Sequence, residues 1–343
     1  MQNTGLASIQ QGNATTSNHP AQAQGSKAFA PPPVSPRGWM LDCLLRLGTT
    51  VGSLLLGGAC VLGAMFAFRQ GALPMIQSVL GLDADAISAA RRVGLLASAL
   101  LAYWGFVRLY ERRAAAELRL RRLPILLGGL GGALLVAVPI ALLFALGAYV
   151  LVGTRELAWS LSGVAAVIVV AATLEELIYR CLLFRIVERS WGTWIALIVQ
   201  ALVFAAVHLE NVEGAGNAVV VTMLLAVTVV GLLWASVFVL TRSLWAAAAN
   251  HAAWNFTILL SGVPLSGIED WRAMAPLQAA LNGPDWLTGG MFGPESSVLV
   301  MVCASLATVF LLRRARAAGQ IQPLSMTSDG AQPSSAAGSS ATR

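Results

Sequence analysis

The residues most suited to catalysis by their side-chain chemistry are two adjacent glutamates inside an apolar run. Glu175, Glu176 and Arg180 lie within residues 157–183, where most other side chains are apolar. Charged side chains at membrane depth cost about 2.5–3.5 kcal/mol each on insertion scales and are usually functional. A helix advances about 100° per residue, so Glu176 and Arg180 share a face and can form an ion pair. Glu175 points elsewhere, and its free carboxylate can take a proton from water. The alternative is that all three only hold helices together.

Two later apolar runs contain a histidine with a partner four residues away. Phe204 and His208 share a helix face, so the phenyl ring can pack over the imidazole. His251 and Asn255 also share a face, and both can donate hydrogen bonds to one oxygen atom, as an oxyanion site requires. Each pair has a plain alternative, an interfacial histidine in the first and an interhelical hydrogen bond in the second. Three such clusters in successive stretches predict one buried hydrolytic site.

Other intramembrane hydrolases fit these residues less well. The zinc motif HExxH is absent, because the sequence that follows His208 is Leu-Glu-Asn-Val. The sequence contains no GxGD loop, the motif of paired-aspartate proteases. The sequence also contains no GxSx motif with a histidine partner on a helix, the pattern of rhomboid-type serine enzymes.

The composition places these clusters in a membrane. Of the 343 residues, 57% are hydrophobic and 11% are charged, whereas soluble domains contain about 25% charged residues. The apolar runs are long enough to cross the hydrocarbon core as helices, and they are continuous rather than alternating, which argues against a β-barrel. The net charge of +6 comes from arginines at the ends of these runs, which is typical of loop anchoring. We therefore do not expect nucleic-acid binding.

The predicted fold class is all-α, a polytopic membrane helix bundle of about eight transmembrane helices. The expected spans cover residues 47–68, 93–107, 123–152, 157–187, 194–208, 218–240, 244–261 and 297–312. The second and fifth spans are short and can recruit flanking residues, while the third and fourth are long enough to tilt or to protrude.

Charge asymmetry predicts the orientation of these spans. The links after the second, fourth, sixth and eighth spans carry arginines, whereas the opposite links carry more acidic residues. The largest group follows the second span and consists of Arg108, Arg112, Arg113, Arg119, Arg121 and Arg122. The positive-inside rule then puts both termini in the cytoplasm. We expect a multi-pass integral membrane protein in contact with membrane lipid, and the tails and arginine-rich loops suit a bacterial inner membrane.

Both ends of the chain are predicted to be disordered. Residues 1–38 and 317–343 are rich in small and polar residues, which cannot bury enough apolar surface to offset the entropy of ordering. Residues 39–316 between them are expected to form one intramembrane domain. Its longest link, residues 264–295, is either an interfacial loop with tryptophans at headgroup level or a lid near the site.

The three clusters together resemble the signatures of the CPBP intramembrane proteases. The signatures are Glu175-Glu176-x-x-x-Arg180, Phe204-x-x-x-His208 and His251-x-x-x-Asn255, inside a motif core of residues 123–261. This family, also known as the Abi family, includes the type II CAAX prenyl endopeptidases and bacteriocin-processing or self-immunity proteins. The resemblance implies an eight-helix core in which Glu175 and His208 activate water. It also implies that His251 and Asn255 stabilise the oxyanion.

The resemblance leaves the cofactor open. The family has been interpreted both as metalloproteases and as metal-free, glutamate-dependent hydrolases. Glu175, His208 and His251 could ligate zinc and leave an open fourth position. In either case the expected partner is a membrane-associated peptide or protein substrate. The alternatives are a non-catalytic immunity or scaffold protein and, less favoured, a transporter, which would show broken helices in two similar halves.

Overall fold

The structure is a computed structural model that describes residues 36–157, 159–268 and 270–324. The chain divides into two compact units, residues 1–41 and 42–343, and the arrangement given below is that of the second unit. The predicted disordered tail, residues 1–38, lies outside the described residues as far as residue 35. Its last residues are helical, because the first helix begins at Pro36.

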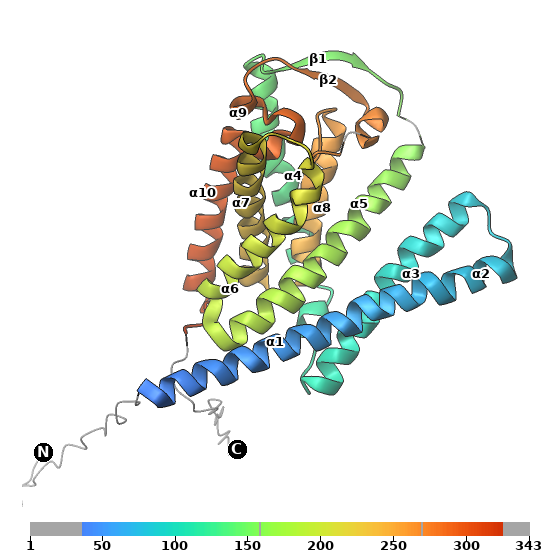
Figure 1. Cartoon of the computed structure of the whole chain (residues 1–343). Helices are drawn as coiled ribbons and strands as arrows, with labels where there is room; N and C mark the ends of the chain where they lie inside the picture. The colour runs from blue at the N-terminus through green and yellow to red at the C-terminus, as the bar shows by residue number, and fades with distance from the viewer. Residues whose placement is uncertain (1–35, 158, 269, 325–343) are drawn as a thin grey trace, which may run out of the picture. The chain divides into compact units, whose positions relative to one another are not determined.

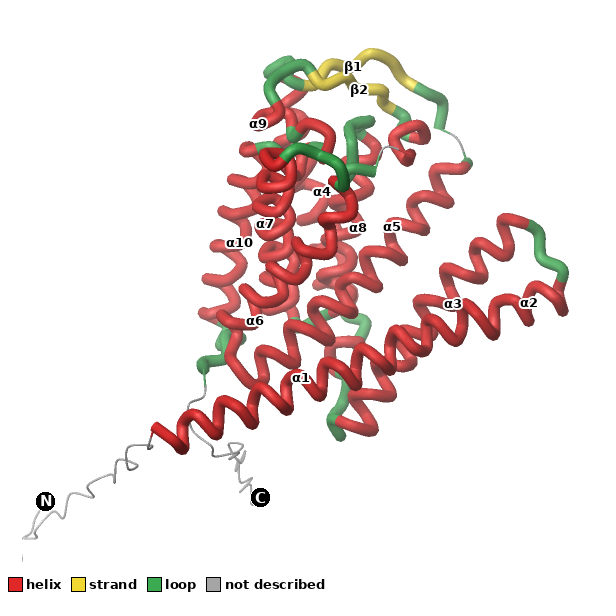
Figure 2. Tube along the Cα trace, in the orientation of Figure 1, coloured by secondary structure: helices red, strands yellow, loops and turns green. Residues whose placement is uncertain are grey.

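The described chain consists mainly of helices, as predicted (Figures 1 and 2). They are α1 (Pro36–Ala67), α2 (Leu73–Leu80), α3 (Ala84–Gly105), α4 (Arg122–Ala145), α5 (Ser160–Glu176), α6 (Arg185–Val207), α7 (Asn217–Thr241), α8 (Leu244–Leu260), α9 (Asp285–Thr288) and α10 (Val298–Ala317). π-Helical segments continue α1, α3 and α5, at Phe68–Ala72, Phe106–Tyr110 and Leu177–Phe184. Two short strands, β1 (Tyr149–Thr154) and β2 (Leu277–Leu281), pair antiparallel.

Six helical runs of the described chain are long and apolar enough to cross a membrane. They are Gly38–Leu80, Ala84–Tyr110, Arg122–Ala145, Ser160–Val212, Asn217–Thr241 and Val298–Ala317. The fourth run is broken at Gly192, whose φ of 78° and ψ of 167° are not helical, and α8 adds a further apolar helix of 17 residues. The predicted multi-pass helix bundle is confirmed. The predicted count of eight depends on dividing the fourth run at Gly192 and on counting α8.

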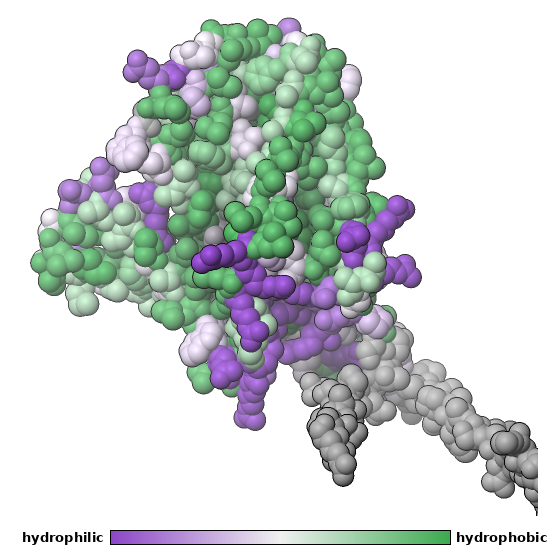
Figure 3. All heavy atoms as spheres, turned by 180° about the vertical axis from the view of Figure 1, so that it is seen from behind, coloured by the Kyte–Doolittle hydropathy of each residue, from purple (hydrophilic) through white to green (hydrophobic). Residues whose placement is uncertain are grey.

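The outer surface of the helices is apolar. Hydrophobic residues cover most of the face shown in Figure 3, and hydrophilic residues gather toward one end of it. Leu55, Leu101 and Leu126, on three different helices, are 69%, 67% and 69% exposed. Leaving apolar surface in water costs about 25 cal/mol per Å², so such exposure is favourable only where lipid replaces water. The surface is that of an integral membrane protein.

The predicted third span, residues 123–152, is too long. α4 ends at Ala145, and Gly147 turns the chain with a φ of 73°. Residues 150–152, Val-Leu-Val, then continue in β1, where Val150 pairs with Ala280 of β2. Valine favours a pleated, half-buried position, and an apolar run alone does not distinguish a strand from the end of a helix.

α4 packs closely on α8 because two glycines of α4 face it. A Cβ atom at Gly128 would lie 2.4 Å from the carbonyl oxygen of Ala246, and one at Gly132 would lie 2.1 Å from that of Asn250. The Asn250 side chain strengthens the contact, since its Nδ2 donates to the Gly128 carbonyl oxygen at 2.9 Å. Small residues four apart let membrane helices touch through their backbones. This contact holds α8, the helix that carries His251.

A Gly132→Ala variant is expected to lose about 1–3 kcal/mol of stability, the usual cost of overpacking a close contact. The added methyl group would have to push α8 away from α4. Gly129→Ala is the matched control on the same helix, because the nearest atom to its Cβ would be 3.9 Å away. Thermal unfolding of both variants in the same detergent measures the difference. Equal melting temperatures would contradict the close contact.

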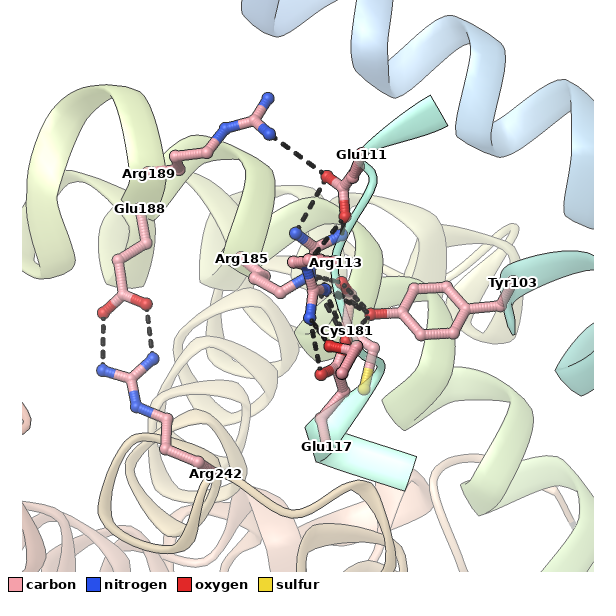
Figure 4. Close-up of polar contacts among 10 residues, drawn as sticks. Tyr103, Glu111, Arg113, Glu117, Cys181, Arg185, Glu188, Arg189 and Arg242 are labelled. Atoms are coloured by element: carbon pink, nitrogen blue, oxygen red, sulfur yellow. Dashed lines mark hydrogen bonds and ion pairs between the residues drawn. The ribbon is translucent and has the colours of Figure 1, made fainter. Parts of the chain in front are cut away.

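A network of ion pairs surrounds the end of the π-helical segment Leu177–Phe184 (Figure 4). Arg185 Nη2 lies 2.9 Å from Glu111 Oε2, and Arg185 Nε donates to the Tyr103 hydroxyl at 3.1 Å. That hydroxyl lies 3.1 Å from the carbonyl oxygen of Cys181. The arginine-rich link is therefore attached through Glu111 to Arg185 at the start of α6, and α3 is attached through Tyr103 to the segment that carries Arg180.

The residues that follow α10, here termed the C-terminal strap (residues 318–324), pack back on the break in α6. The backbone nitrogen of Thr193 donates to the Gln322 carbonyl oxygen at 3.0 Å, and the Thr193 hydroxyl accepts from the Gln322 backbone nitrogen at 2.8 Å. Arg242, directly after α7, donates to Gln320 Oε1 at 3.3 Å. The boundary predicted for the disordered C-terminal tail, residues 317–343, is therefore too early. The rest of that tail lies outside the described residues.

Candidate functional site

The predicted ion pair of the first cluster is present and lies in the core. α5 ends at Glu176, and the helix continues in π-helical form through Arg180. Glu176 Oε2 and Arg180 Nε are 3.1 Å apart, and both side chains are fully buried. Charges in a low-dielectric interior have to be paired in this way. π-Helical turns inside α-helices occur frequently at functional sites.

Aromatic rings and a backbone carbonyl enclose Arg180. Its Nη2 donates to the Gly231 carbonyl oxygen at 3.1 Å. Its Cζ lies 4.8 Å from the ring centre of Phe204 and 5.8 Å from that of Trp234, within the range of cation–π attraction. Phe204, expected to support the site through His208, thus also packs on Arg180. The guanidinium links the π-helical segment to α6 and α7.

His251 is held in one orientation by its neighbours. Its Nδ1 lies 3.0 Å from Glu176 Oε1, and because an ionised carboxylate only accepts hydrogen bonds, this nitrogen carries a proton. Its Nε2 lies 3.9 Å from Glu175 Oε2. The indole ring of Trp234 stacks on the imidazole, with ring centres 3.5 Å apart and planes at 16°. Neither the contact with Glu176 nor the stacking on Trp234 follows from sequence spacing.

Glu175 is the more accessible of the two glutamates. Its side chain is 35% exposed, whereas that of Glu176 is 0% exposed. Among the described residues, the ion-pair contact of Glu175 is with His251 at 3.9 Å, while Arg180 is paired with Glu176. The predicted division, with one glutamate neutralised and the other left free, is present in the structure.

His208 lies at the C-terminal end of α6. Its Nδ1 lies 2.7 Å from the carbonyl oxygen of Phe204, and because a carbonyl oxygen only accepts, Nδ1 carries the proton. In the neutral ring, Nε2 then keeps its lone pair and can accept a hydrogen bond. The Phe204 ring packs on the imidazole as predicted, with centres 4.5 Å apart and planes at 50°.

The four predicted catalytic residues line one cavity of about 320 Å³. Glu175 comes from α5, His208 from the end of α6, and both His251 and Asn255 come from α8. In the view of Figure 1, α5 and α6 run obliquely to α7. Asn255 Oδ1 has no hydrogen-bond partner within the described residues, so this amide oxygen is unsatisfied at the cavity wall.

The long link between α8 and α10 also contributes to the wall of this cavity. Ser266, Trp271 and Glu295 line it, whereas Trp286 of the same link is 62% exposed. Ser266 Oγ donates to Glu295 Oε2 at 2.5 Å. The sequence predicted the link near the site only as one of two alternatives, and it did not predict Glu295 as a site residue. The available signal was a lone acid in a Gly/Pro-containing turn directly before the last span.

Glu295 is 2% exposed. Some of its surroundings raise the pKa of its carboxyl and others lower it. Burial raises the pKa of the Glu295 carboxyl above its ordinary value, because a low-dielectric surrounding disfavours the charged form. The Ser266 hydroxyl and the imidazoles of His208 and His251 act in the opposite direction. The net shift is upward, so the cavity contains a second acid that differs from Glu175 in burial.

The described residues contain no group of three His, Cys, Asp or Glu side chains that could hold a metal ion. His251 Nδ1 is engaged by Glu176 and His208 Nδ1 by Phe204, which leaves Nε2 of each ring as the nitrogen that a metal could reach. As the side chains lie in this structure, Glu175, His208 and His251 do not form a group of three zinc ligands.

The segment that carries these residues matches a known protein family. Residues 157–257 match the family described as type II CAAX prenyl endopeptidase, Rce1-like. The matched segment contains all three clusters, and the predicted resemblance is confirmed. A search of curated proteins gave no match. At the family level, this helical core is therefore similar to that of a CAAX-type membrane protease.

Proposed function

We propose that this protein is an intramembrane endopeptidase that hydrolyses a peptide bond in a membrane-associated peptide or protein. The observation that carries the proposal is that Glu175, His208, His251 and Asn255, from three helices, line one cavity. The family match of residues 157–257 supports it. A bundle that used these side chains only to hold its helices together would not need to gather them around an open volume.

Glu175 acts as the general base. Its carboxylate is partly exposed to the cavity and is not neutralised by Arg180, which is paired with Glu176. It takes one proton from a water molecule, and the water oxygen attacks the carbonyl carbon of the peptide. His208 orients this water, because its Nε2 lone pair can accept the second water hydrogen while Nδ1 is held by Phe204. General bases placed in this way contribute about 10²–10⁴-fold to the rate.

Asn255 and His251 stabilise the tetrahedral oxyanion that this attack creates. The Asn255 amide can donate one hydrogen bond into the cavity that it lines. His251 can donate a second from Nε2 when the ring carries both protons, because Nδ1 remains bonded to Glu176. Donors that are fixed before the reaction stabilise developing charge without a cost of reorganisation. The stacking of Trp234 on the imidazole supplies that fixation.

We also propose that both termini lie in the cytoplasm, with the bacterial inner membrane as the favoured location. The ion-pair network around Glu111 contains three arginines, Arg113, Arg185 and Arg189. Arg242 directly follows α7 and pairs with Glu188, which lies in the first turn of α6 (Figure 4). Arginine-rich links next to spans are retained on the cytoplasmic side.

The experiment that tests the function compares membrane proteomes of cells that express the native protein or its Glu175→Gln variant. New peptide N-termini are expected only with the native protein, because the variant cannot take the proton from water. Glu210→Gln is the matched control, an exposed glutamate outside the cavity lining, and it should give the native pattern. Identical N-termini with native protein and Glu175→Gln would contradict the proposal and would favour a non-catalytic immunity or scaffold protein.

A further inference from the structure

The cavity contains a carboxyl group that the motif residues do not include. Glu295 lies in the short turn Pro294–Ser296, directly before α10, and its side chain reaches the cavity that Glu175 lines. One of its oxygens, Oε2, accepts from the Ser266 hydroxyl at 2.5 Å. The Trp254 indole also lies close enough to lower the pKa of this carboxyl. Among the described residues no arginine or lysine pairs with this carboxyl, which is 2% exposed.

The charged and titratable groups around Glu295 are few. Within the described residues, His208 and His251 lower its pKa, and Glu175 lines the same cavity. Of the elements packed against its turn, α7 contains no titratable residue and α9 contains Asp285. α10 has Cys303 in its second turn, and its arginines lie in its last turns. Burial raises the pKa of this carboxyl, the hydrogen-bonding groups and the two imidazoles lower it, and the net direction is upward.

The reaction proposed above requires a proton donor as well as a base. When the C–N bond of the tetrahedral intermediate breaks, the leaving nitrogen must gain a proton, because an amide anion is not expelled from such an intermediate. Glu175 has just gained a proton, but it lies beside the attacking oxygen. A second acid in the same cavity can deliver the proton from another direction, and pairs of acids with different surroundings commonly divide the two tasks.

We propose that Glu295 is the general acid that protonates the leaving amine nitrogen, with Ser266 holding its carboxyl in place. The proposal rests on the proposed peptidase function. The carboxyl Oε–H bond of Glu295 breaks, the N–H bond of the amine forms, and the C–N bond breaks. Glu295 becomes a carboxylate, and the proton that Glu175 took from water restores it through the solvent of the cavity. The net reaction consumes one water molecule and leaves both carboxyl groups as they began.

The first experiment examines the proton without any substrate. The native protein and its Glu295→Gln variant are placed in vesicles of phosphatidylethanolamine and phosphatidylglycerol, and their infrared spectra are subtracted at neutral pH. We expect the difference to contain the carbonyl stretch of a protonated carboxyl group, lost in the variant. Loss of a carboxylate stretch instead would overturn the proposal, because an ionised Glu295 cannot donate.

The second experiment uses a fluorescence-quenched peptide built on a cut site found in the proteome comparison. Glu295→Gln is expected to lower kcat by about 10²-fold or more and to remove the alkaline limb of the pH profile. Ser266→Ala removes a hydrogen bond that lowers the pKa of Glu295, so its alkaline limb should move to higher pH. Asp285→Asn, outside the lining of this cavity, is the control and should keep the native profile.

The outcomes separate this proposal from the one on which it rests. If Glu175→Gln abolishes cleavage while Glu295→Gln keeps kcat within about threefold and leaves the alkaline limb in place, the peptidase stands and Glu295 is not its acid. If Glu175→Gln cleaves like the native protein, both proposals fail. If Glu295→Gln does not fold, the shift of the alkaline limb in Ser266→Ala decides, and an unmoved limb contradicts the assignment.

Discussion

A Glu175→Gln variant is expected to fold like the native protein and to lose about 10²–10⁴-fold in kcat. Glutamine has nearly the same shape as glutamate but cannot take a proton from water. The Glu175 side chain is 35% exposed and is not paired with an arginine, so removing its charge leaves no other charge without a partner. Initial rates with a quenched peptide in vesicles measure the loss, and thermal unfolding in detergent measures the stability.

The neighbouring glutamate provides the contrast for this experiment. Glu176 is fully buried and is bonded to both Arg180 and His251. Glu176→Gln is therefore expected to lower the melting temperature, because it leaves the guanidinium of Arg180 buried without a counter-charge. Two glutamates next to each other in sequence should then separate catalysis from stability. A Glu175→Gln variant that melted as early as Glu176→Gln would contradict the division of roles.

An Arg180→Met variant is expected to have the largest effect on stability, a loss of about 3–5 kcal/mol, as for other buried pairs that lose one partner. The Glu176 carboxylate would remain at 0% exposure with the imidazole of His251 as its contact. The cation–π contacts of Arg180 with Phe204 and Trp234 would also be lost. Thermal unfolding in detergent, on protein purified from membranes, is the measurement.

A double variant tests whether charge is the cause. Glu176→Gln combined with Arg180→Met removes both charges, so its stability should recover most of the loss, as happens when a whole buried pair is replaced. Its activity should not recover, because a glutamine oxygen is a weaker acceptor for His251 Nδ1 than the Glu176 carboxylate. If the double variant is no more stable than Arg180→Met alone, packing rather than an uncompensated charge explains the loss.

The local part of the site could be predicted from sequence because helical spacing determines it. Residues four apart in a helix are neighbours, and this rule yielded both the Glu176–Arg180 ion pair and the packing of Phe204 on His208. The same geometry left Glu175 free. The helix changes to π-helical form directly after Glu176 and stays so through Arg180, and the two side chains still lie within reach of each other.

The contacts between helices could not be predicted. The spacing of residues in the sequence shows which side chains share a helix face, but not which other helix packs against that face. The hydrogen bond from His251 to Glu176 joins residues 75 positions apart, and Trp234 stacks on His251 from a third helix. Glu295 reaches the cavity only because the link before α10 folds back over it. One acid in a loop carries no periodic signal, whereas two acids in an apolar helix are conspicuous.

The C-terminal strap has a consequence for how the protein is made. Thr193, at the break in α6, is bonded to Gln322, and Arg242 is bonded to Gln320. These partners leave the ribosome only after every spanning helix of the described chain. The helices that carry the site must therefore enter the bilayer before the break in α6 gains its bonds. A chain terminated before Gln320 would contain all four cavity side chains and still lack the hydrogen bonds from Thr193 and Arg242 to the C-terminal strap.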